Sequence, residues 1–340
     1  MIELLKKLIS INSISGNEEE IISFISDFLN QNSVEHKKIG NNIIVELGKG
    51  QKTLCIVAHI DTVPATDGWS SGPFKVSIND DKIFGLGAVD NKSSVSTLLE
   101  LILEFQEIEL NGKIIFVFTS EEESNMNGIE TVLSHIKPDS AIICEPTNLI
   151  PCTAQKGFVN LNLKTKGKNS HAAFPGKGDN AIYKMIKELE KIKNITFEKE
   201  YPLLGYPTIS PTIISGGIEH NIIPDKCEVI LDIRTTPIYD NNTVIEEIKN
   251  IVDCKIEVLS NRLKPIETKN NEFVKIAEEV CDSKSTGFLA LSEMCFFDCP
   301  AIVLGPGFLE QAHKPDEYIE ISQLEKTKNI YKKIIKGFLS

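Results

Sequence analysis

The sequence predicts an α/β protein with a mostly parallel sheet, flanking helices, and an inserted ferredoxin-like α+β domain. The sheet is predicted from short runs rich in Ile and Val, a composition typical of strands buried on both faces. Each run passes directly into functional or turn residues, and the segments concerned are 53–61, 113–123, 140–146 and 300–307. The insertion is predicted because strands beyond Gly157 alternate apolar and polar residues, which is typical of half-exposed antiparallel strands.

The other segments before the insertion supply the helices and outer strands that such a sheet requires. Apolar residues at helical spacing indicate helices, and extended patterns next to turn residues indicate strands. The predicted elements are, in order, a helix at 18–31, a turn and strand at 36–48, a strand at 75–87 and a helix at 93–106. The buried strands and their connecting helices then continue as far as Pro146.

The inserted segment follows the order β-α-β-β-α-β, which is the ferredoxin-like arrangement. Its predicted elements are a strand at 158–167, a helix at 180–192, strands at 208–215 and 227–234, a helix at 243–252 and a strand at 255–259. The α/β pattern resumes with the helical segment 272–280. We therefore expect residues 1–156 and 265–340 to form one domain, with residues 157–264 inserted as a second.

Composition excludes several classes of function. A formal net charge of −12 over 340 residues argues against nucleic-acid binding, which needs clustered Lys and Arg. No apolar run approaches the length that spans a membrane, and the first residues lack a signal-peptide pattern. The 8 cysteines include no CxxC pair, and we interpret them as small buried side chains. We expect a soluble cytoplasmic protein without a membrane partner.

Metal-binding side chains stand where the buried strands end. In open α/β sheets, active sites form beyond the carboxyl ends of the strands. The residues at these positions are His59, Asp61, Glu122, Glu123, Glu145 and, after a short loop, His313. Two imidazoles with several carboxylates make a mixed nitrogen and oxygen site that suits zinc. The pattern indicates a metalloenzyme.

Two of the acidic residues have specific expected roles. His59 and Asp61 lie on the same side of an extended segment, so Asp61 can hold the ring of a metal-bound imidazole, although a solvent-facing pair is the alternative. Asp90 lies between a strand and a helix and could simply cap that helix. The glycines before it favour a buried carboxylate instead, and a bridging one would hold two metals close together.

The remaining acidic candidates also follow buried strands. Runs of acid are usually solvated, but residues 121–123 come directly after a buried strand. Adjacent side chains point in different directions, so one carboxylate can bind metal while its neighbour acts as a general base. Glu145 would be costly to bury unless a metal or hydrogen bonds satisfied it. His313 follows the last buried strand, which makes it a better ligand candidate than the other histidines.

Six motifs occur in an order that resembles a known family. They are HIDTVP, GLGAVDNK, TSEEES, CEPT, KGKNSHAAFP and GPGFLEQAHKPDEY. Together they resemble the di-zinc peptidases and deacylases that include acetylornithine deacetylase, succinyl-diaminopimelate desuccinylase and the aminoacylases. The resemblance runs essentially from end to end. It implies a zinc-peptidase-like α/β domain and an inserted domain that serves as a lid and as the contact of a homodimer.

The resemblance also implies a role for each matching residue. His59, Asp90 and Glu145 would hold one zinc ion, and Asp90, Glu123 and His313 would hold the second, with Asp90 bridging. Glu122 would be the general base, Asp61 would orient the imidazole of His59, and His171 would reach across the dimer to stabilise the oxyanion. Arg234 and Asn221 match positions that contact the substrate carboxylate. Co²⁺ or Mn²⁺ could replace Zn²⁺ at such ligands.

The expected substrate is an N-acylated amino acid, most specifically N2-acetyl-ornithine in arginine biosynthesis. Relatives that remove succinyl groups carry arginines where this chain has Lys156 and Glu293. Losing two guanidinium groups removes bidentate carboxylate anchors, and Glu293 could instead meet a cationic amine. Succinyl-diaminopimelate desuccinylase, N-acetyl-lysine deacetylase and dipeptidase activities remain alternatives, and a non-catalytic binding protein would not need Glu122. Asn91, Ser93 and Ser124 depart from the residues common in the family.

Overall fold

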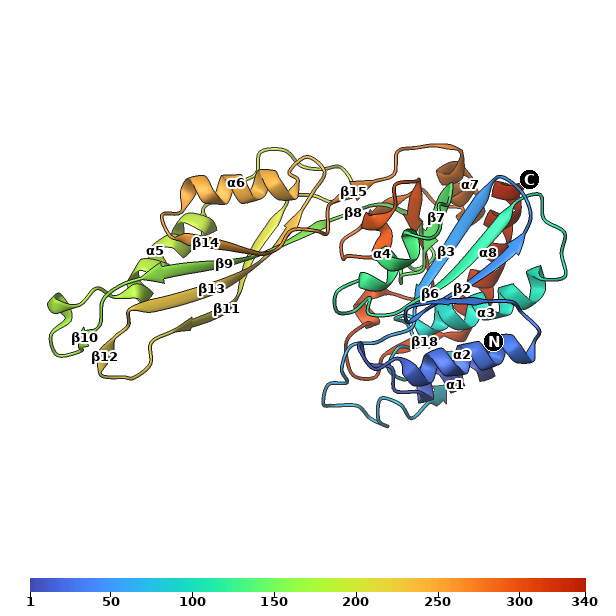
Figure 1. The fold of residues 1–340 in the computed structure, drawn as a ribbon, viewed down its shortest axis with the longest axis horizontal. Helices are drawn as coiled ribbons and strands as arrows, with labels where there is room; N and C mark the ends of the chain where they lie inside the picture. The colour runs from blue at the N-terminus through green and yellow to red at the C-terminus, as the bar shows by residue number, and fades with distance from the viewer. The chain divides into compact units, whose positions relative to one another are not determined.

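The computed structural model describes residues 1–340, and the chain divides into two compact units (Figure 1). The first unit comprises Met1–Thr153, Thr268–Phe288 and Ser292–Ser340. The second comprises Ala154–Glu267 together with Leu289–Leu291. None of the helices is both long enough and apolar enough to span a membrane.

A mixed sheet forms the centre of the first unit, in the order β1-β2-β6-β3-β7-β17-β8-β15, with β16 paired to β8. Its last strand β15 and the second half of β8 belong to the segment counted with the second unit. The four strands β6, β3, β7 and β17 are parallel to one another, and the strands on either side of them are antiparallel. The bounds are β1 Lys37–Ile39, β2 Asn42–Gly48, β3 Thr53–His59, β6 Lys113–Thr119, β7 Ser140–Ile143, β8 Cys152–Gln155, β15 Ile266–Glu267, β16 Thr286–Phe288 and β17 Ala301–Val303. The predicted α/β sheet is confirmed, with its parallel part confined to the centre.

Helices pack against this sheet and enclose the main hydrophobic core. They are α1 Ile2–Ser10, α2 Glu19–Gln31, α3 Lys92–Phe105, α4 Asn127–Leu133, α7 Glu272–Cys281 and α8 Ile321–Leu339. Helix α3 contacts α1, α8 and the central strand β3, and 11 of its 14 residues are buried. It begins directly after Asp90, so the best-buried helix of the unit fixes the position of that carboxylate.

A smaller antiparallel sheet, β18-β5-β4, joins two segments that are far apart in the sequence. Its strands are β4 Ser77–Asn79, β5 Lys82–Phe84 and β18 Tyr318–Glu320. The short helices η2 Glu293–Phe296 and η3 Leu309–Gln311 lie in the loops on either side of β17. Pairing of β18 with β5 brings the chain after His313 beside the loop that leads to Asp90.

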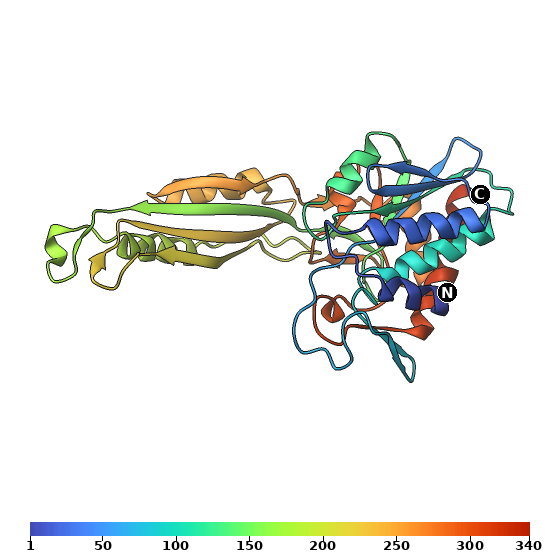
Figure 2. The same cartoon turned by 60° about the horizontal axis from the view of Figure 1, so that its bottom comes forward.

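The second unit is a four-stranded antiparallel sheet in the order β11-β13-β9-β14, and helices α5 and α6 pack against it and against each other (Figure 2). Inward-facing side chains of β13 alternate strictly with partly exposed ones, as its sequence predicts. The bounds are β9 Gly157–Lys166, β10 Ser170–His171, η1 Pro175–Lys177, α5 Ala181–Lys193, β11 Thr208–Gly216, β12 Ile222–Ile223, β13 Lys226–Thr235, α6 Asn241–Ile251 and β14 Lys255–Ser260. The ferredoxin-like prediction is confirmed, with the short ribbon β10-β12 added to it.

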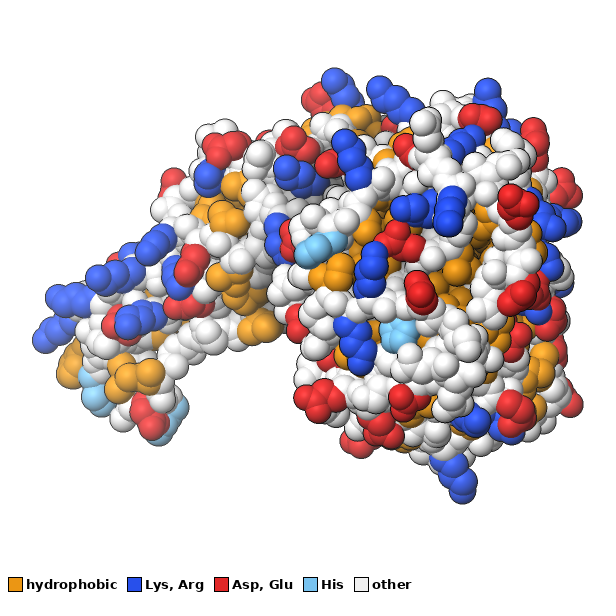
Figure 3. All heavy atoms as spheres, turned by 45° about the vertical axis from the view of Figure 1, so that its right-hand side comes forward, with side chains coloured by type: hydrophobic (Ala, Val, Ile, Leu, Met, Phe, Trp, Pro, Cys, Tyr) orange, Lys and Arg blue, Asp and Glu red, His pale blue; other side chains and the backbone are white.

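Acidic and basic side chains intermingle on the face of the first unit shown in Figure 3, where no broad basic surface is seen.

Candidate metal centre

The ends of the parallel strands bring the predicted metal ligands to one edge of the sheet. Strand β3 ends at His59, and the acidic residues 121–123 follow the neighbouring strand β6. On the other side of β3, strand β7 leads into Glu145, and β17 leads into the loop of His313. Because neighbouring parallel strands end together, residues that are distant in the sequence meet here.

Asp90 lies between the two predicted imidazole ligands. Its Oδ1 is 3.0 Å from Nε2 of His59, and its Oδ2 is 3.3 Å from Nε2 of His313. The Nδ1–H of His59 donates to the backbone carbonyl of Asp61 at 3.0 Å, which leaves Nε2 as the ring atom available to a metal. One carboxylate thus faces two imidazoles with a different oxygen toward each.

Two further carboxylates complete the cluster. Oε1 of Glu145 is 3.8 Å from Nε2 of His59, and Oε1 of Glu123 is 2.9 Å from Nε2 of His313. Ligand atoms of His59, Asp90 and Glu123 all lie within 4.8 Å of one another. Two imidazole nitrogens and three carboxylates form a donor set that fits a pair of zinc ions, with Asp90 available to both.

The protonation of these groups reflects how much negative charge is concentrated at the site. Burial raises the pKa of Glu145, and the charge of Asp90 raises it further. Burial also raises the pKa of Glu123. Burial alone would raise the pKa of Asp90, but hydrogen bonds with His313 and His59 hold it well below its usual value. A cation would stabilise such a cluster strongly, because the carboxylates repel one another when ionised.

Asp61 holds the loop that carries the predicted base. Its Oδ1 accepts from the backbone N–H of Glu122 at 3.1 Å, and its Oδ2 accepts from that of Glu123 at 3.0 Å. The carboxylate of Glu122 is buried, and burial raises its pKa well above the usual value. Asp61 therefore links His59 to both predicted site residues of the acidic loop, Glu122 and Glu123.

The loop of Asp90 is held by Glu317, which sequence reasoning missed. The buried carboxylate of Glu317 accepts from the backbone N–H groups of Gly87, Val89 and Asp90 at 3.1, 2.8 and 3.0 Å. Gly87 has a φ of +81°, and a Cβ there would lie 2.9 Å from the side chains of Lys92 and Thr62. Tight packing thus fixes the backbone that presents the Asp90 carboxylate to the two imidazoles.

Asn91 and Lys92 add two contacts to the same loop. The Asn91 amide donates to the backbone carbonyl of Cys144, next to Glu145. The Lys92 ammonium is fully buried and donates to the carbonyl of Ile11 at 2.7 Å. Asn91, one of the departures from the family pattern, therefore ties the Asp90 loop to the strand end that carries another ligand.

Glu293, the predicted substrate contact in the first unit, is buried beside the centre. Its Oε2 accepts from the hydroxyl of Thr119 at 3.0 Å, and its Oε1 has no hydrogen-bond partner. Burial raises its pKa to about 8, against the opposing effect of His59. Glu293 also contributes to the raised pKa of Glu122, which shows that the two carboxylates are close enough to interact.

The other predicted contacts lie in the second unit, where each has a local partner. Lys156 donates to the carbonyl of Tyr206 at 2.9 Å. The guanidinium of Arg234 donates to both oxygens of Asp232 at 2.7 and 2.9 Å.

His171 and Asn221 are exposed residues near one another. His171 lies on β10, and its Nδ1 accepts from the backbone N–H of Ala173 at 3.1 Å. The carbonyl of Asn221 accepts from the N–H of Ala172 at 2.8 Å. Both residues therefore belong to the ribbon formed by β10 and β12.

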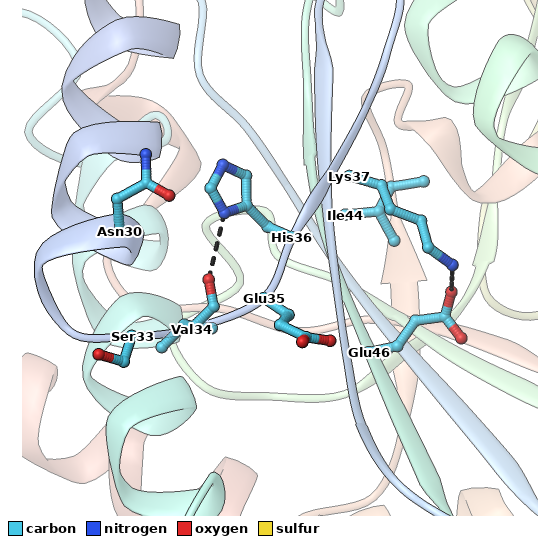
Figure 4. A pocket seen from close by; sticks show the side chains of 8 residues that line it. All are labelled: Asn30, Ser33, Val34, Glu35, His36, Lys37, Ile44 and Glu46. Carbon is cyan, nitrogen blue, oxygen red and sulfur yellow. Dashed lines mark hydrogen bonds and ion pairs between the residues drawn. The ribbon is translucent and has the colours of Figure 1, made fainter.

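A hollow of about 600 Å³ lies away from these residues, at the end of α2 and beside β1 and β2 (Figure 4). His36 bonds to the carbonyl of Val34 at its rim, and Lys37 pairs with Glu46 at 2.9 Å. None of the predicted site residues lines it. The hollow is open, and His36, Lys37 and Glu46 in its lining each have a local partner.

Comparison with known sequences decides the family. Residues 55–337 match the sequence profile of Peptidase family M20/M25/M40. The chain belongs to this family. It is therefore a metal-dependent hydrolase, and the family resemblance carried by the six motifs is confirmed.

Curated relatives of this M20 family member include acetylornithine deacetylases. The enzyme of that name from Buchnera aphidicola subsp. Acyrthosiphon pisum (strain Tuc7) is 31% identical over 99% of this chain and 97% of its own length. That from Shigella sonnei (strain Ss046) is 29% identical with the same coverage. These relatives support hydrolysis of an acylated amino acid.

Solved structures of similar fold include peptidases. Aminopeptidase PepT from Bacillus cereus has a TM-score of 0.82 at 20% identity and covers 100% of this chain and 98% of its own. A dinuclear metal-binding peptidase of the M20 family from Bacillus subtilis has a TM-score of 0.78 at 15% identity, with 99% and 97% covered. At such identities the likeness establishes the fold.

Proposed function

We propose that this M20 family hydrolase cleaves the amide bond of N2-acetyl-ornithine to give ornithine and acetate. The observation that carries the proposal is the buried Glu122 carboxylate beside a cluster of two imidazoles and three carboxylates. The acetylornithine deacetylases that match nearly the whole chain support the choice of substrate. Arginine biosynthesis is the pathway this reaction would serve.

The cluster is proposed to hold two zinc ions. His59, Asp90 and Glu145 would bind one ion, and Asp90, Glu123 and His313 would bind the other. When bound, the two ions would supply Lewis acidity at the amide carbonyl and would lower the pKa of a water molecule toward neutrality.

Glu122 is proposed to move the proton. Its backbone is anchored to Asp61, and its carboxylate is buried, with a pKa raised by that burial. A carboxylate of raised basicity can accept a proton from the attacking water and later deliver it to the leaving amine. Asp61 would hold the acidic loop and the ring of His59 in fixed positions during both proton transfers.

The residues that match substrate contacts support an acetyl rather than a succinyl substrate. A succinyl group brings a second carboxylate, which a free guanidinium would bind best. Lys156 is not a guanidinium, and its ammonium already bonds to the carbonyl of Tyr206. Glu293, with one unpartnered oxygen, is proposed to favour the cationic amine of ornithine. Arg234 and Asn221 are proposed to bind the α-carboxylate, for which Arg234 must exchange Asp232.

We further propose a homodimer formed through the second unit, in which His171 of one subunit stabilises the oxyanion in its partner. Strand β11 supports this proposal because it is an edge strand whose Ile213 and Ile214 are 62% and 59% exposed. Residues 157–264 would be the lid and dimerisation domain. The proposed location is the cytoplasm, which the absence of disulfides among the 8 cysteines supports.

The test measures the steady-state rates at which the zinc-loaded protein hydrolyses four kinds of substrate. These are N2-acetyl-ornithine, N2-acetyl-lysine, N-succinyl-diaminopimelate and a panel of dipeptides. Glu122→Gln, which keeps the shape of the side chain but removes its basicity, should lower kcat by about 10²–10⁴-fold. Glu121→Gln is the matched control in the same loop and should retain the parent rate.

Each outcome bears on a separate part of the proposal. A preference for N2-acetyl-ornithine that Glu122→Gln abolishes would support both the substrate and the base. Equal or faster turnover of the succinylated substrate would overturn the proposed roles of Lys156 and Glu293 in substrate choice. Turnover confined to dipeptides would overturn the deacetylase proposal in favour of a peptidase, the activity for which the similar solved structures are named.

A further inference from the structure

Two buried carboxylates hold three successive backbone N–H groups of the acidic loop. Asp61 accepts from Glu122 and Glu123, as described above. The preceding N–H, that of Glu121, donates to Oε1 of Glu18 at 3.2 Å. Glu121 has a φ of +60°, so this bond acts on the residue at which the chain turns after strand β6.

Glu18 has no evident role in the helix that follows it. It occupies the N-cap position of α2, but its side chain makes no capping hydrogen bond. Its carboxylate is directed to the N–H groups of Gly16 and Glu121, at 2.9 and 3.2 Å. Glu18 is only 2% exposed, and burial raises its pKa. Burying a carboxylate destabilises the fold unless its hydrogen bonds offset the cost, so these two bonds explain its position.

The segment that carries Glu18 also contacts the other loops of the metal centre. The Ser13 hydroxyl donates to the carbonyl of Ile60 at 2.9 Å, between His59 and Asp61. Backbone bonds of 2.9 and 3.0 Å join Thr62 to Ser13 and Ser15. The buried ammonium of Lys92 reaches the carbonyl of Ile11 in the same segment. Residues 11–18 therefore connect the His59, Asp90 and Glu123 loops to one another.

We propose that Glu18 is a positioning residue for the metal centre: by holding the N–H of Glu121 it sets the acidic loop so that Glu123 reaches its metal and Glu122 reaches the substrate water. The part concerning Glu122 rests on the proposed amide hydrolysis. The part concerning Glu123 rests only on the ligand cluster. Residues 11–18 lie outside the segment 55–337 that matches the family profile.

The consequence of losing Glu18 follows from the geometry. Without its acceptor, the partly buried N–H of Glu121 must find another partner, and the turn at φ +60° relaxes. Glu123 lies two residues further on, and its Oε1 is 2.9 Å from Nε2 of His313. A shift of the loop therefore separates Glu123 from His313 and Asp90, while His59 and Glu145 keep their own supports.

The experiment titrates the metal-free protein with Zn²⁺ in a calorimeter and measures kcat and KM separately. The variants are Glu18→Ala, Glu18→Gln and Glu18→Asp, with Glu19→Ala as the control because Glu19 is the exposed neighbour. Glu18→Ala should weaken one of the two metal equivalents by about 10–100-fold, the range found when partners of metal ligands are removed. Its kcat should fall by a similar factor of about 10–100 with KM nearly unchanged, because the substrate contacts are elsewhere.

Conservative variants separate positioning from folding. Glu18→Gln keeps an oxygen that can accept both N–H groups, so it should restore most of the metal affinity. Glu18→Asp is shorter by one methylene and should not. Thermal unfolding checks whether each variant folds. If Glu18→Ala does not fold, the zinc affinities of Glu18→Gln and Glu18→Asp are compared to decide whether Glu18 positions the loop.

Parent-like affinity for both zinc equivalents in Glu18→Ala, or equal affinity in the Gln and Asp variants, would overturn the proposal. The metal titration is independent of catalysis. If the parent hydrolyses none of the tested amides, the proposed function fails, and the zinc affinities still decide the role of Glu18.

Discussion

Buried carboxylates have three different functions in the first unit, and their neighbours decide which one each performs. Asp90 faces two imidazoles and is suited to bind metal. Glu317 and Glu18 face backbone N–H groups and hold loops in place. Glu293 has a single hydroxyl partner and one oxygen with none. The least satisfied of these carboxylates is the one that the proposed function directs toward a cationic substrate.

The burial of Glu293 predicts a pH-dependent cost to stability. Its folded-state pKa of about 8 lies above its ordinary value of 4.5, so protonation is favoured in the folded protein. The stability that protonated Glu293 contributes is fully present below pH 4.5 and is lost as the pH rises to about 8. Glu293→Gln should therefore stabilise the metal-free protein near neutral pH, by about 3 kcal/mol at 1.36 kcal/mol per pKa unit.

The measurement is denaturant unfolding of parent and Glu293→Gln proteins, freed of metal, at pH values from 5 to 9. Titrating groups that do not interact with Glu293 are common to both proteins, so they cancel in the difference. The advantage of the variant should widen with pH and become constant above about pH 8. A difference that does not change with pH would show that Glu293 is ionised at little cost in the folded state.

His59, Glu123 and Glu145 could be proposed as ligands from the sequence because each stands at or just after the end of a run of buried-strand composition. Asp90 could be proposed from the glycines before it, and His313 from the short loop that joins it to the last such run. Glu18 and Glu317 could not be recognised in this way. Glu18 opens a run of three glutamates, and Glu317 follows Asp316, so both look like members of solvated acidic segments. Their partners are 103 and 227 residues away, in Glu121 and Asp90, and only the folded chain brings them together.

At the scale of elements, the metal centre depends on how closely the ends of neighbouring strands approach. The buried central strands were predictable, because Ile and Val runs have few other uses in a soluble protein. The antiparallel direction of β8 and β15 could not be predicted, because strands of 4 and 2 residues are too short to show an alternation of apolar and polar residues. The contact between the ends of β7 and β17 could not be predicted from the sequence either, because it depends on the register of the parallel pair.

Gly305 makes this contact between strand ends close enough for the site. A Cβ at Gly305 would lie 2.5 Å from the backbone oxygen of Glu145, closer than real Cβ contacts. Gly305→Ala should therefore push the end of β7 away from β17. We expect a loss of about 1–3 kcal/mol in the free energy of unfolding, the usual cost of overpacking. Zinc affinity should fall as well, because Glu145 is displaced.

Thermal unfolding and zinc titration of Gly305→Ala measure the two effects. Gly176→Ala is the matched control, since a Cβ there meets no heavy atom within 4 Å. If the destabilised Gly305→Ala protein bound zinc with the affinity of the parent, the end of β7 would have shifted without displacing Glu145 from the metal.

At the scale of the whole chain, the change from buried strands to alternating strands near residue 157 predicted an insertion, and the second unit has its own core. Alternation predicts which face of a strand is buried, but it does not predict which strand lies at the edge. Strand β11 is an edge strand, and all but one of its residues are exposed. A free edge with exposed isoleucines invites pairing with another chain, and a second copy would pair with it symmetrically.

The proposed homodimer can be tested through that edge and through catalysis together. Ile213→Lys with Ile214→Lys should convert a species of twice 37.8 kDa into a monomer in sedimentation equilibrium, because two charges would be buried without partners at the pairing edge. Ile78→Lys, at an exposed isoleucine of the first unit, is the control.

If His171 acts in the partner's site, the Glu122→Gln and His171→Ala proteins are each inactive alone. An equal mixture of the two should recover about a quarter of the parent activity, because half of the randomly paired dimers are mixed and each mixed dimer has one intact site. A dimer that persists in the β11 variant would exclude this edge as the contact, and a mixture without recovered activity would exclude the exchange of His171 between subunits.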